Sequence, residues 1–226
     1  MGERGRVIAL EGGSAAGKTT LVRAAAQQLG GYPLAEAVDR LDPSPSLEFS
    51  SSRELLQLES LLLTEESRRY REARRAAQRG ETVFADTGFL GPVTYTRGLV
   101  ALGRAGAPVY RSVERIARDL VDRGALGIPD LTVYLATTPR ERARRARADR
   151  PHHARPEFAR HEAVGAVERT YFEELFPDAL PGRFRSVRGG PGVPVLVREL
   201  REVVERSRTT PATRADGRAL LRRLQL

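Results

Sequence analysis

The residues that could do chemistry begin at Gly12. The run from Gly12 to Thr19 reads GGSAAGKT and fits the pattern Gly-x-x-x-x-Gly-Lys-[Ser/Thr] without a mismatch. Glycines let the backbone curl so that its N–H groups point at phosphate oxygens, and a helix starting there adds the positive end of its dipole. In this pattern the lysine reaches the β- and γ-phosphates and the Thr19 hydroxyl is a ligand for Mg²⁺. We therefore expect ATP and Mg²⁺ as cofactors, held by Gly12, Gly13, Ser14, Ala15, Ala16, Gly17, Lys18, Thr19 and Thr20.

Lys18 supports this interpretation independently. Lysine and arginine together number 38, and Lys18 is the one lysine among them. It stands where a compact ammonium is needed and a planar guanidinium would not fit. A GTPase would also need a second lysine in its guanine-reading Asn-Lys-x-Asp segment, so the sequence argues against that class.

Composition limits the other possibilities. The chain has 226 residues with 40% hydrophobic and 30% charged residues, which suits one mid-sized globular domain. The net charge is +9, but the arginines are scattered and aromatics are only 6%, so no nucleic-acid partner is expected. There is no cysteine, and no apolar run approaches the roughly 18 residues of a membrane span. We expect a cytoplasmic protein without a membrane partner.

Short apolar runs alternate with helical patterns, which predicts a parallel sheet of about five strands with helices on both faces. No element is predicted between Asp86 and Pro108. The expected strands are 7–10, 33–35, 82–86, 131–135 and 184–187. The expected helices are 19–29, 53–79 (one helix or two), 108–123, one opened by Pro139, 158–175 and 195–204. Ligands of such sheets bind at the carboxyl ends of the strands, where the motif lies.

Several segments resemble known kinases. Ala9–Gly12 leading into Gly17–Thr20 resembles the opening of thymidylate kinases, and Gly80–Asp86 is similar to their third strand. Asp130–Leu135 with Pro139 and Arg145 resembles the strand and mobile lid of thymidylate and deoxynucleoside kinases. A second resemblance, to chloramphenicol phosphotransferase, rests on four short segments. They are Gly12-Gly13-Ser14 with Ala16-Gly17-Lys18, Val38-Asp39 with Leu41, Asp86 with Phe89-Leu90-Gly91, and Ala146-Arg147 with Asp149-Arg150.

These resemblances imply a P-loop kinase-type three-layer α/β sandwich. We expect a kinase domain over residues 1–206, with a lid at about 138–157, and a C-terminal tail or helix over 207–226. The resembled kinases are often oligomers, so a homodimer is possible.

Asp86 and the lid arginines are the candidate catalytic groups beside Lys18. Asp86 ends a strand next to the P-loop strand, where a carboxylate holds magnesium or orients the acceptor. In the resembled kinases, lid arginines fold over the transferring phosphoryl group. Of the six candidates we expect two, Arg145 and Arg150, to act, and the others to form a solvated face. The six are Arg140, Arg142, Arg144, Arg145, Arg147 and Arg150.

The kind of acceptor is predicted from two phosphate-binding arginines that this sequence lacks. Thymidylate kinases grip the acceptor's phosphate with arginines at positions that hold Thr87 and Glu65 here. Asp39 resembles the base of chloramphenicol phosphotransferase, and Glu36 is the alternative base. We therefore hypothesise transfer of the γ-phosphoryl group to a hydroxyl of a small nucleoside-like molecule or antibiotic. The alternatives are a nucleoside monophosphate kinase and a nucleotide-binding regulator without an acceptor.

Overall fold

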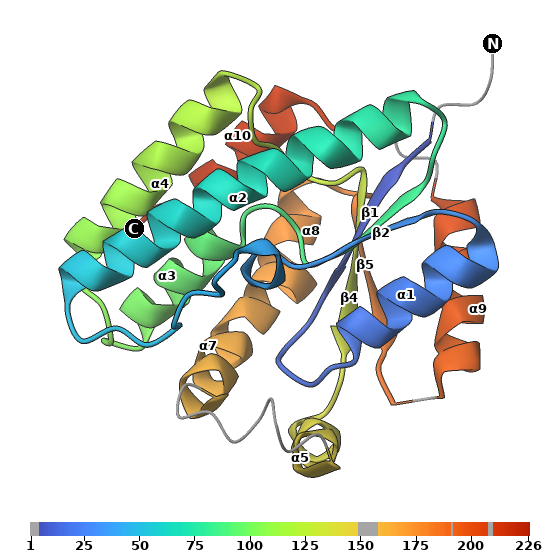
Figure 1. Ribbon diagram of the computed structural model, residues 1–226, viewed down its shortest axis with the longest axis horizontal. Coiled ribbons are helices and arrows are strands. Elements are labelled where there is room, and N and C mark those ends of the chain that lie inside the picture. Colours follow the sequence, from blue (N-terminus) through green and yellow to red (C-terminus); the bar gives the residue numbers. More distant parts are fainter. Residues whose placement is uncertain (1–4, 149–157, 191, 208–209) are drawn as a thin grey trace.

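The apolar runs of the sequence form one parallel sheet. The computed structural model describes residues 5–148, 158–190, 192–207 and 210–226. Within them five strands lie in the order β2-β3-β1-β4-β5 (Figure 1). They are β1 (Val7–Glu11), β2 (Tyr32–Leu34), β3 (Val83–Asp86), β4 (Leu131–Ala136) and β5 (Phe184–Arg188). The predicted fold class is confirmed.

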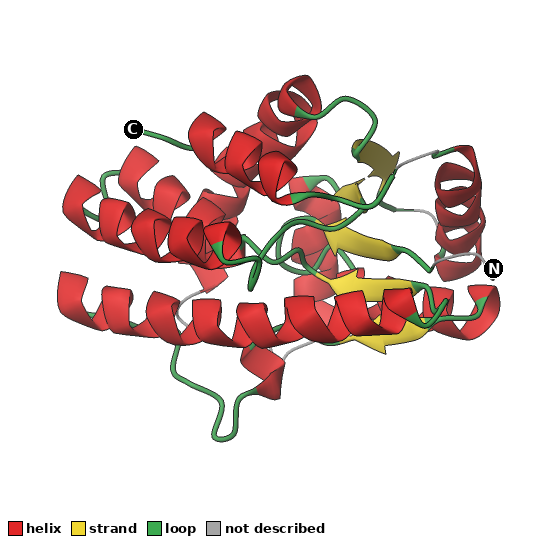
Figure 2. Cartoon of the chain, turned by 90° about the horizontal axis from the view of Figure 1, so that it is seen from above, coloured by secondary structure: helices red, strands yellow, loops and turns green. Residues whose placement is uncertain are grey.

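Helices cover both faces of the sheet because alternate strand residues point in opposite directions. Ile8 and Leu10 pack on one side with the helices Lys18–Leu29 and Val193–Arg206. Val7 and Ala9 pack on the other side with the helices Ser52–Gln78, Ala107–Asp122 and Arg214–Arg223. Figure 2 shows the strands between the two groups of helices. The helices are α1 (Lys18–Leu29), α2 (Ser52–Gln78), α3 (Gly91–Ala101), α4 (Ala107–Asp122), α5 (Pro139–Ala148), α7 (Phe158–Thr170), α8 (Phe176–Ala179), α9 (Val193–Arg206) and α10 (Arg214–Arg223).

Helix α3 lies where no element is predicted. Its sequence is rich in glycine, threonine and other weak helix formers, so local propensity does not predict a helix here. Pro92 stands in its first turn, where proline is tolerated. A Cβ atom on Gly98 would lie 2.8 Å from Cγ1 of Val164 in α7. The missing side chain thus allows close packing of the two helices, and tertiary contact outweighs propensity.

The C-terminal helix α10 packs on the same core as α4. That core buries Leu220, Leu221 and Leu224. The Tyr110 hydroxyl donates a hydrogen bond to the Leu224 carbonyl oxygen at a distance of 2.5 Å. The predicted division between residues 1–206 and a tail stays a prediction. Among the described helices, none is both long and apolar enough to cross a membrane.

Candidate functional site

The phosphate-binding loop joins β1 to α1, so the strand–loop–helix context required by the motif is present. The backbone of the loop takes positive φ at Gly12 (147°), Ala15 (58°) and Gly17 (97°), which curls it tightly. The Lys18 ammonium donates to the carbonyl oxygens of Gly12 (2.9 Å) and Gly13 (3.4 Å). Its charge therefore lies at the mouth of the loop.

Thr19 and Asp86 meet beside this loop. Strand β3 pairs with β1 and sets Asp86 opposite Leu10, at the carboxyl end of the sheet. The Thr19 hydroxyl donates to Oδ2 of Asp86, while Oδ1 of Asp86 is buried without a hydrogen-bond partner among the described residues. A hydroxyl and an unsatisfied carboxylate are the hard oxygen donors that Mg²⁺ takes. The described residues contain no cluster of three or more acidic, histidine or cysteine ligands, so phosphate and water oxygens would complete such a site.

Two arginines of α5 lie against the loop. Arg145 donates to the Ala16 carbonyl oxygen, and its guanidinium lies 3.0 Å from where a Cβ on Gly17 would stand. Arg142 is buried, and its guanidinium lies 3.1 Å from where a Cβ on Gly13 would stand. It also makes a bidentate ion pair with the Glu162 carboxylate.

The other described lid arginines face outward. Arg140, Arg144 and Arg147 are exposed and line an open surface hollow, and Arg144 pairs with Glu141 of its own helix. Arg150 lies outside the described residues, as does most of the second half of the expected lid. The structure therefore places Arg145 against the phosphate loop, and its predicted catalytic role stays a prediction. It also places Arg142 there, which sequence reasoning assigned to the solvated face.

A cavity of about 270 Å³ opens beside the loop, between it and helices α2, α3 and α7. We call it the P-loop cavity. Gly12, Gly13, Ser14 and Lys18 line one end, and Leu58, Leu62 and Pro92 contribute apolar wall. Its volume lies near the lower end of the range for small-molecule sites, so an occupant would be small.

Five glutamates line the P-loop cavity: Glu11, Glu36, Glu59, Glu66 and Glu168. Burial raises the pKa of each carboxyl, to about 8 for Glu11 and to about 7 for Glu66 and Glu168. Burial also raises the pKa of Glu36, an effect that the nearby Lys18 opposes. The walls are therefore acidic, yet carboxyls kept partly protonated at neutral pH can exchange protons with an occupant.

Asp39 and Glu36, the two predicted candidates for the base, lie in different environments. Asp39 is exposed in the helical turn Val38–Arg40 and is not among the residues that line the P-loop cavity. Glu36 lines the cavity, and the charges of Lys18 and Asp86 act on its carboxyl. The role predicted for Asp39 stays a prediction, but the geometry favours Glu36.

Sequence reasoning missed the helical glutamates because charged helix residues normally face water. The signal is in the spacing, since Glu59 falls midway between Leu55 and Leu63, four residues from each, on the buried stripe of α2. Glu168 stands likewise four residues after the buried Val164. A carboxylate on an apolar stripe needs a partner or a function.

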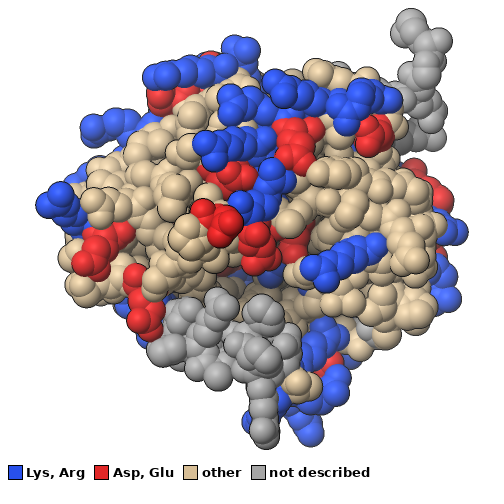
Figure 3. Space-filling model, viewed as in Figure 1, with Lys and Arg blue, Asp and Glu red and all other residues tan. Residues whose placement is uncertain are grey.

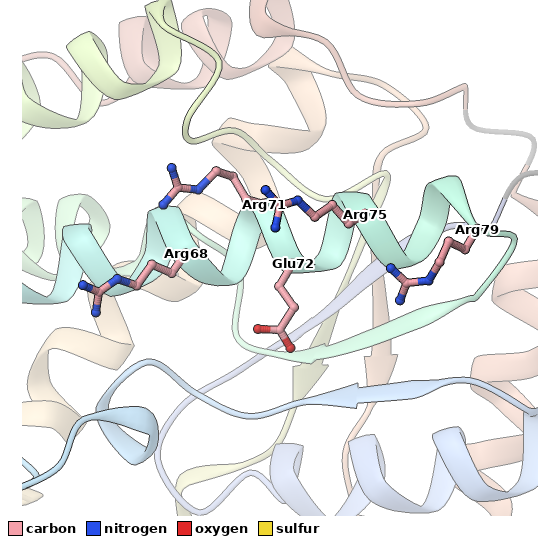
Figure 4. A pocket seen from close by; sticks show the side chains of 5 residues that line it. All are labelled: Arg68, Arg71, Glu72, Arg75 and Arg79. Carbon is pink, nitrogen blue, oxygen red and sulfur yellow. The ribbon is translucent and has the colours of Figure 1, made fainter.

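A second hollow lies apart from the site, on the outer face of α2. Its lining residues project from that helix and from Arg79, which directly follows it (Figure 4), and basic side chains gather over α2 in the upper part of Figure 3. Glu72 turns away from this row and pairs with Arg40, which also pairs with Glu65. The Glu65 carboxylate is thus already paired with Arg40 and with Arg68 of its own helix. The hollow is lined by Arg68, Arg71, Glu72, Arg75 and Arg79.

The comparison with protein-family models shows the family to which the chain belongs. A family model described as an AAA domain matches residues 7–164, which is more than half of the chain and includes the phosphate loop, Asp86 and α5. The chain belongs to this AAA-domain family. It carries a P-loop nucleotide-binding domain, and no curated protein matches its sequence.

Solved structures similar to this AAA-domain chain include nucleoside and nucleotide kinases. Deoxyadenosine kinase from M. mycoides with bound dATP has a TM-score of 0.70 at 16% identity, over 88% of this chain and 99% of that one. Thymidylate kinase from Candida albicans has a TM-score of 0.61 at 17% identity, over 89% and 92%. The fold therefore resembles those kinases, as the sequence predicts. The resemblance to chloramphenicol phosphotransferase stays a prediction.

Proposed function

We propose that this protein is an ATP-dependent kinase that moves the γ-phosphoryl group to a hydroxyl of a small molecule bound in the P-loop cavity. The observation that carries the proposal is that Lys18 and Glu36 line one cavity with the phosphate loop. ATP and the acceptor would therefore meet between the Lys18 ammonium and the Glu36 carboxylate.

Each group has a role in this reaction. The acceptor oxygen forms a bond to the γ-phosphorus as the bond to the bridging oxygen breaks and ADP leaves. The hydroxyl proton goes to the Glu36 carboxylate, whose raised pKa brings it nearer to the working pH of a base. Lys18, Arg142 and Arg145 would stabilise charge on the phosphates. A magnesium ion held by Thr19 and Asp86 would neutralise phosphate charge.

A monophosphate acceptor fits this site less well. Such a group carries up to two negative charges and needs fixed arginines. Arg69 is the nearest candidate, but it is fully buried and donates to Glu66 (2.5 Å) and to the Asp86 carbonyl oxygen (2.7 Å). No arginine lines the P-loop cavity among the described residues. These contacts favour a hydroxyl acceptor over a nucleoside monophosphate.

The test measures ATP consumption with a panel of small alcohols, nucleosides and antibiotics, and identifies the phosphorylated product by mass. We expect Glu36→Gln to lower turnover by about 100-fold, in the range of general base catalysis, with nucleotide affinity little changed. Asp39→Asn is the matched variant. If Asp39→Asn abolishes transfer and Glu36→Gln does not, Asp39 is the base. If ATP consumption never depends on an added acceptor, a nucleotide-binding regulator is the better description.

A further inference from the structure

The lining of the P-loop cavity has a chemical character that phosphate binding does not explain. Its lining residues include five glutamates against a single lysine or arginine, Lys18, which belongs to the phosphate loop. Four of the glutamates have a partner or a counter-charge near that loop. Glu11 accepts from the Gly88 N–H (2.7 Å), Glu66 pairs with Arg69, and the charge of Lys18 acts on both Glu36 and Glu168.

Glu59 is the fifth, and Glu168 lies near enough for its charge to act on Glu59. Glu59 comes from α2, is 1% exposed, and its Oε2 atom has no hydrogen-bond partner in the described structure. Glu168 comes from α7 and accepts a hydrogen bond from the Thr94 hydroxyl (2.7 Å). Burial raises the pKa of Glu59 well above its usual range, and the charge of Glu168 raises it further.

Glu59 is placed unfavourably in the unliganded protein. A buried carboxyl without a cation loses its hydration and gains little in return, and a second carboxyl nearby adds repulsion. An apolar side chain such as those of neighbouring Leu55 and Leu63 would fill the position of Glu59 more favourably. Groups that oppose stability in this way tend to mark functional sites.

The walls around the pair suit an organic cation. Leu58, Leu62 and Pro92 are apolar, and the Tyr95 ring stands edge-on to His161 with their centroids 5.2 Å apart. Apolar and aromatic surface with an embedded carboxylate is the environment that binds ammonium groups and flat cations.

We propose that the small molecule bound here carries a positive charge, which Glu59 and Glu168 hold where α2 and α7 line the P-loop cavity. The acceptor is then a cation with a hydroxyl group, such as an amino alcohol, an amino sugar or a quaternary ammonium alcohol. The cation neutralises the two carboxyls, while the hydroxyl faces Glu36 and Lys18. This inference rests on the proposed function for the hydroxyl, but the cation site itself is independent of phosphoryl transfer.

The test uses matched pairs of probes that differ in charge and not in size. Choline is compared with 3,3-dimethylbutan-1-ol, and glucosamine with glucose, by calorimetry on the full chain without ATP and with a non-hydrolysable ATP analogue. We expect the cationic member of at least one pair to bind about tenfold tighter or more, as cations do at desolvated aromatic and carboxylate sites. Equal binding within both pairs, or no binding of either cation at millimolar concentration, would overturn the proposal.

Variants then locate the charge recognition. Glu59→Gln and Glu168→Gln keep the shape of the side chain and should each remove most of the preference for the cation. Glu174→Gln, an exposed glutamate that follows α7, is the control and should leave it unchanged. Retained preference in both cavity variants, with native thermal melts, would contradict the assignment. Cation binding without any phosphoryl transfer would sink the kinase proposal and leave this one standing, and phosphorylation of neutral alcohols alone would do the reverse.

Discussion

The hydroxyl of Thr19 donates to the carboxylate of Asp86, although 67 residues separate the two along the chain. Thr19 belongs to the first turn of α1 and Asp86 to the end of β3, so adjacent pairing of β1 and β3 brings them together. The second carboxylate oxygen of Asp86 is buried without a partner in the described structure.

This pair predicts a magnesium-dependent nucleotide affinity. Asp86→Asn keeps the hydrogen bond from Thr19 but removes the negative charge that a divalent cation needs. We expect ATP affinity in the presence of Mg²⁺ to fall by about tenfold or more, in the range of disturbed metal sites. Calorimetric titration with ATP, in Mg²⁺ and in EDTA, measures it. A loss of equal size in EDTA would show that Asp86 acts structurally.

Lys18 should be irreplaceable by arginine. Its ammonium reaches two carbonyl oxygens of the curled loop, a space that a larger planar guanidinium cannot enter. We expect both Lys18→Arg and Lys18→Ala to abolish phosphoryl transfer while the thermal melt stays native. Near-normal turnover of Lys18→Arg would show that this lysine does not contact the phosphates.

Two neighbouring arginines of α5 form a matched test of the lid. Arg145 touches the phosphate loop at Ala16, whereas Arg144 is exposed and pairs with Glu141. Arg145→Ala should cost about 3 kcal/mol of transition-state stabilisation, roughly a hundredfold in turnover, as for other preorganised donors. Arg144→Ala should have little effect. Similar small losses in both variants would mean that α5 is only a solvated basic face, and the role predicted for Arg150 would lose its support.

The acidic cavity should make folding stability fall as the pH rises. The pKa of Glu168 is raised to about 7 in the folded chain, mainly by burial, against about 4.3 for an unfolded glutamate. The folded state therefore keeps a proton that the unfolded state has released. Stability from this group is complete below about pH 4 and is lost as the pH rises toward 7.

Glu168→Gln tests this pH dependence directly. The variant cannot titrate, and its amide oxygen can still accept from Thr94. Denaturant unfolding should give similar stabilities at pH 4, with Glu168→Gln the more stable protein at pH 8 by up to about 3 kcal/mol. Glu174→Gln should follow the wild-type curve. Parallel curves for all three proteins would mean that the pKa of Glu168 is not raised in the folded chain.

Much of the fold is readable from the sequence because strands of a parallel sheet are short, apolar and bounded by turns. The runs around Val7, Val83 and Leu131 have this form, and the phosphate loop then fixes which strand end carries the site. Helix α3 escaped prediction because the feature that creates it, the close approach of Val164 to Gly98, joins residues far apart in sequence.

The candidate site was readable only where its chemistry is local. Lys18 and Thr19 stand in one contiguous motif. The environment of Glu36, in contrast, depends on how the segment after β2 folds back toward Lys18, and no local pattern separates it from Asp39. Arg142 and Arg145 are both arginines of one helix, and only the packing of α5 shows that both reach the loop.

Helix α2 fixes the spacing between two of the glutamates that line the P-loop cavity. It runs unbroken from Ser52 to Gln78, and its buried face carries Glu59 and Glu66 along the cavity and then Arg69, which holds the end of β3. Seven helical residues span about 10 Å, so Glu59 and Glu66 stand about that far apart along one rigid rod. In the proposed complex, this spacing would set how far a cation held at Glu59 lies from the part of the cavity that Glu66 lines. A one-residue insertion between the two glutamates would turn Glu59 by about 100° relative to Glu66, so the two carboxyls would no longer line one cavity.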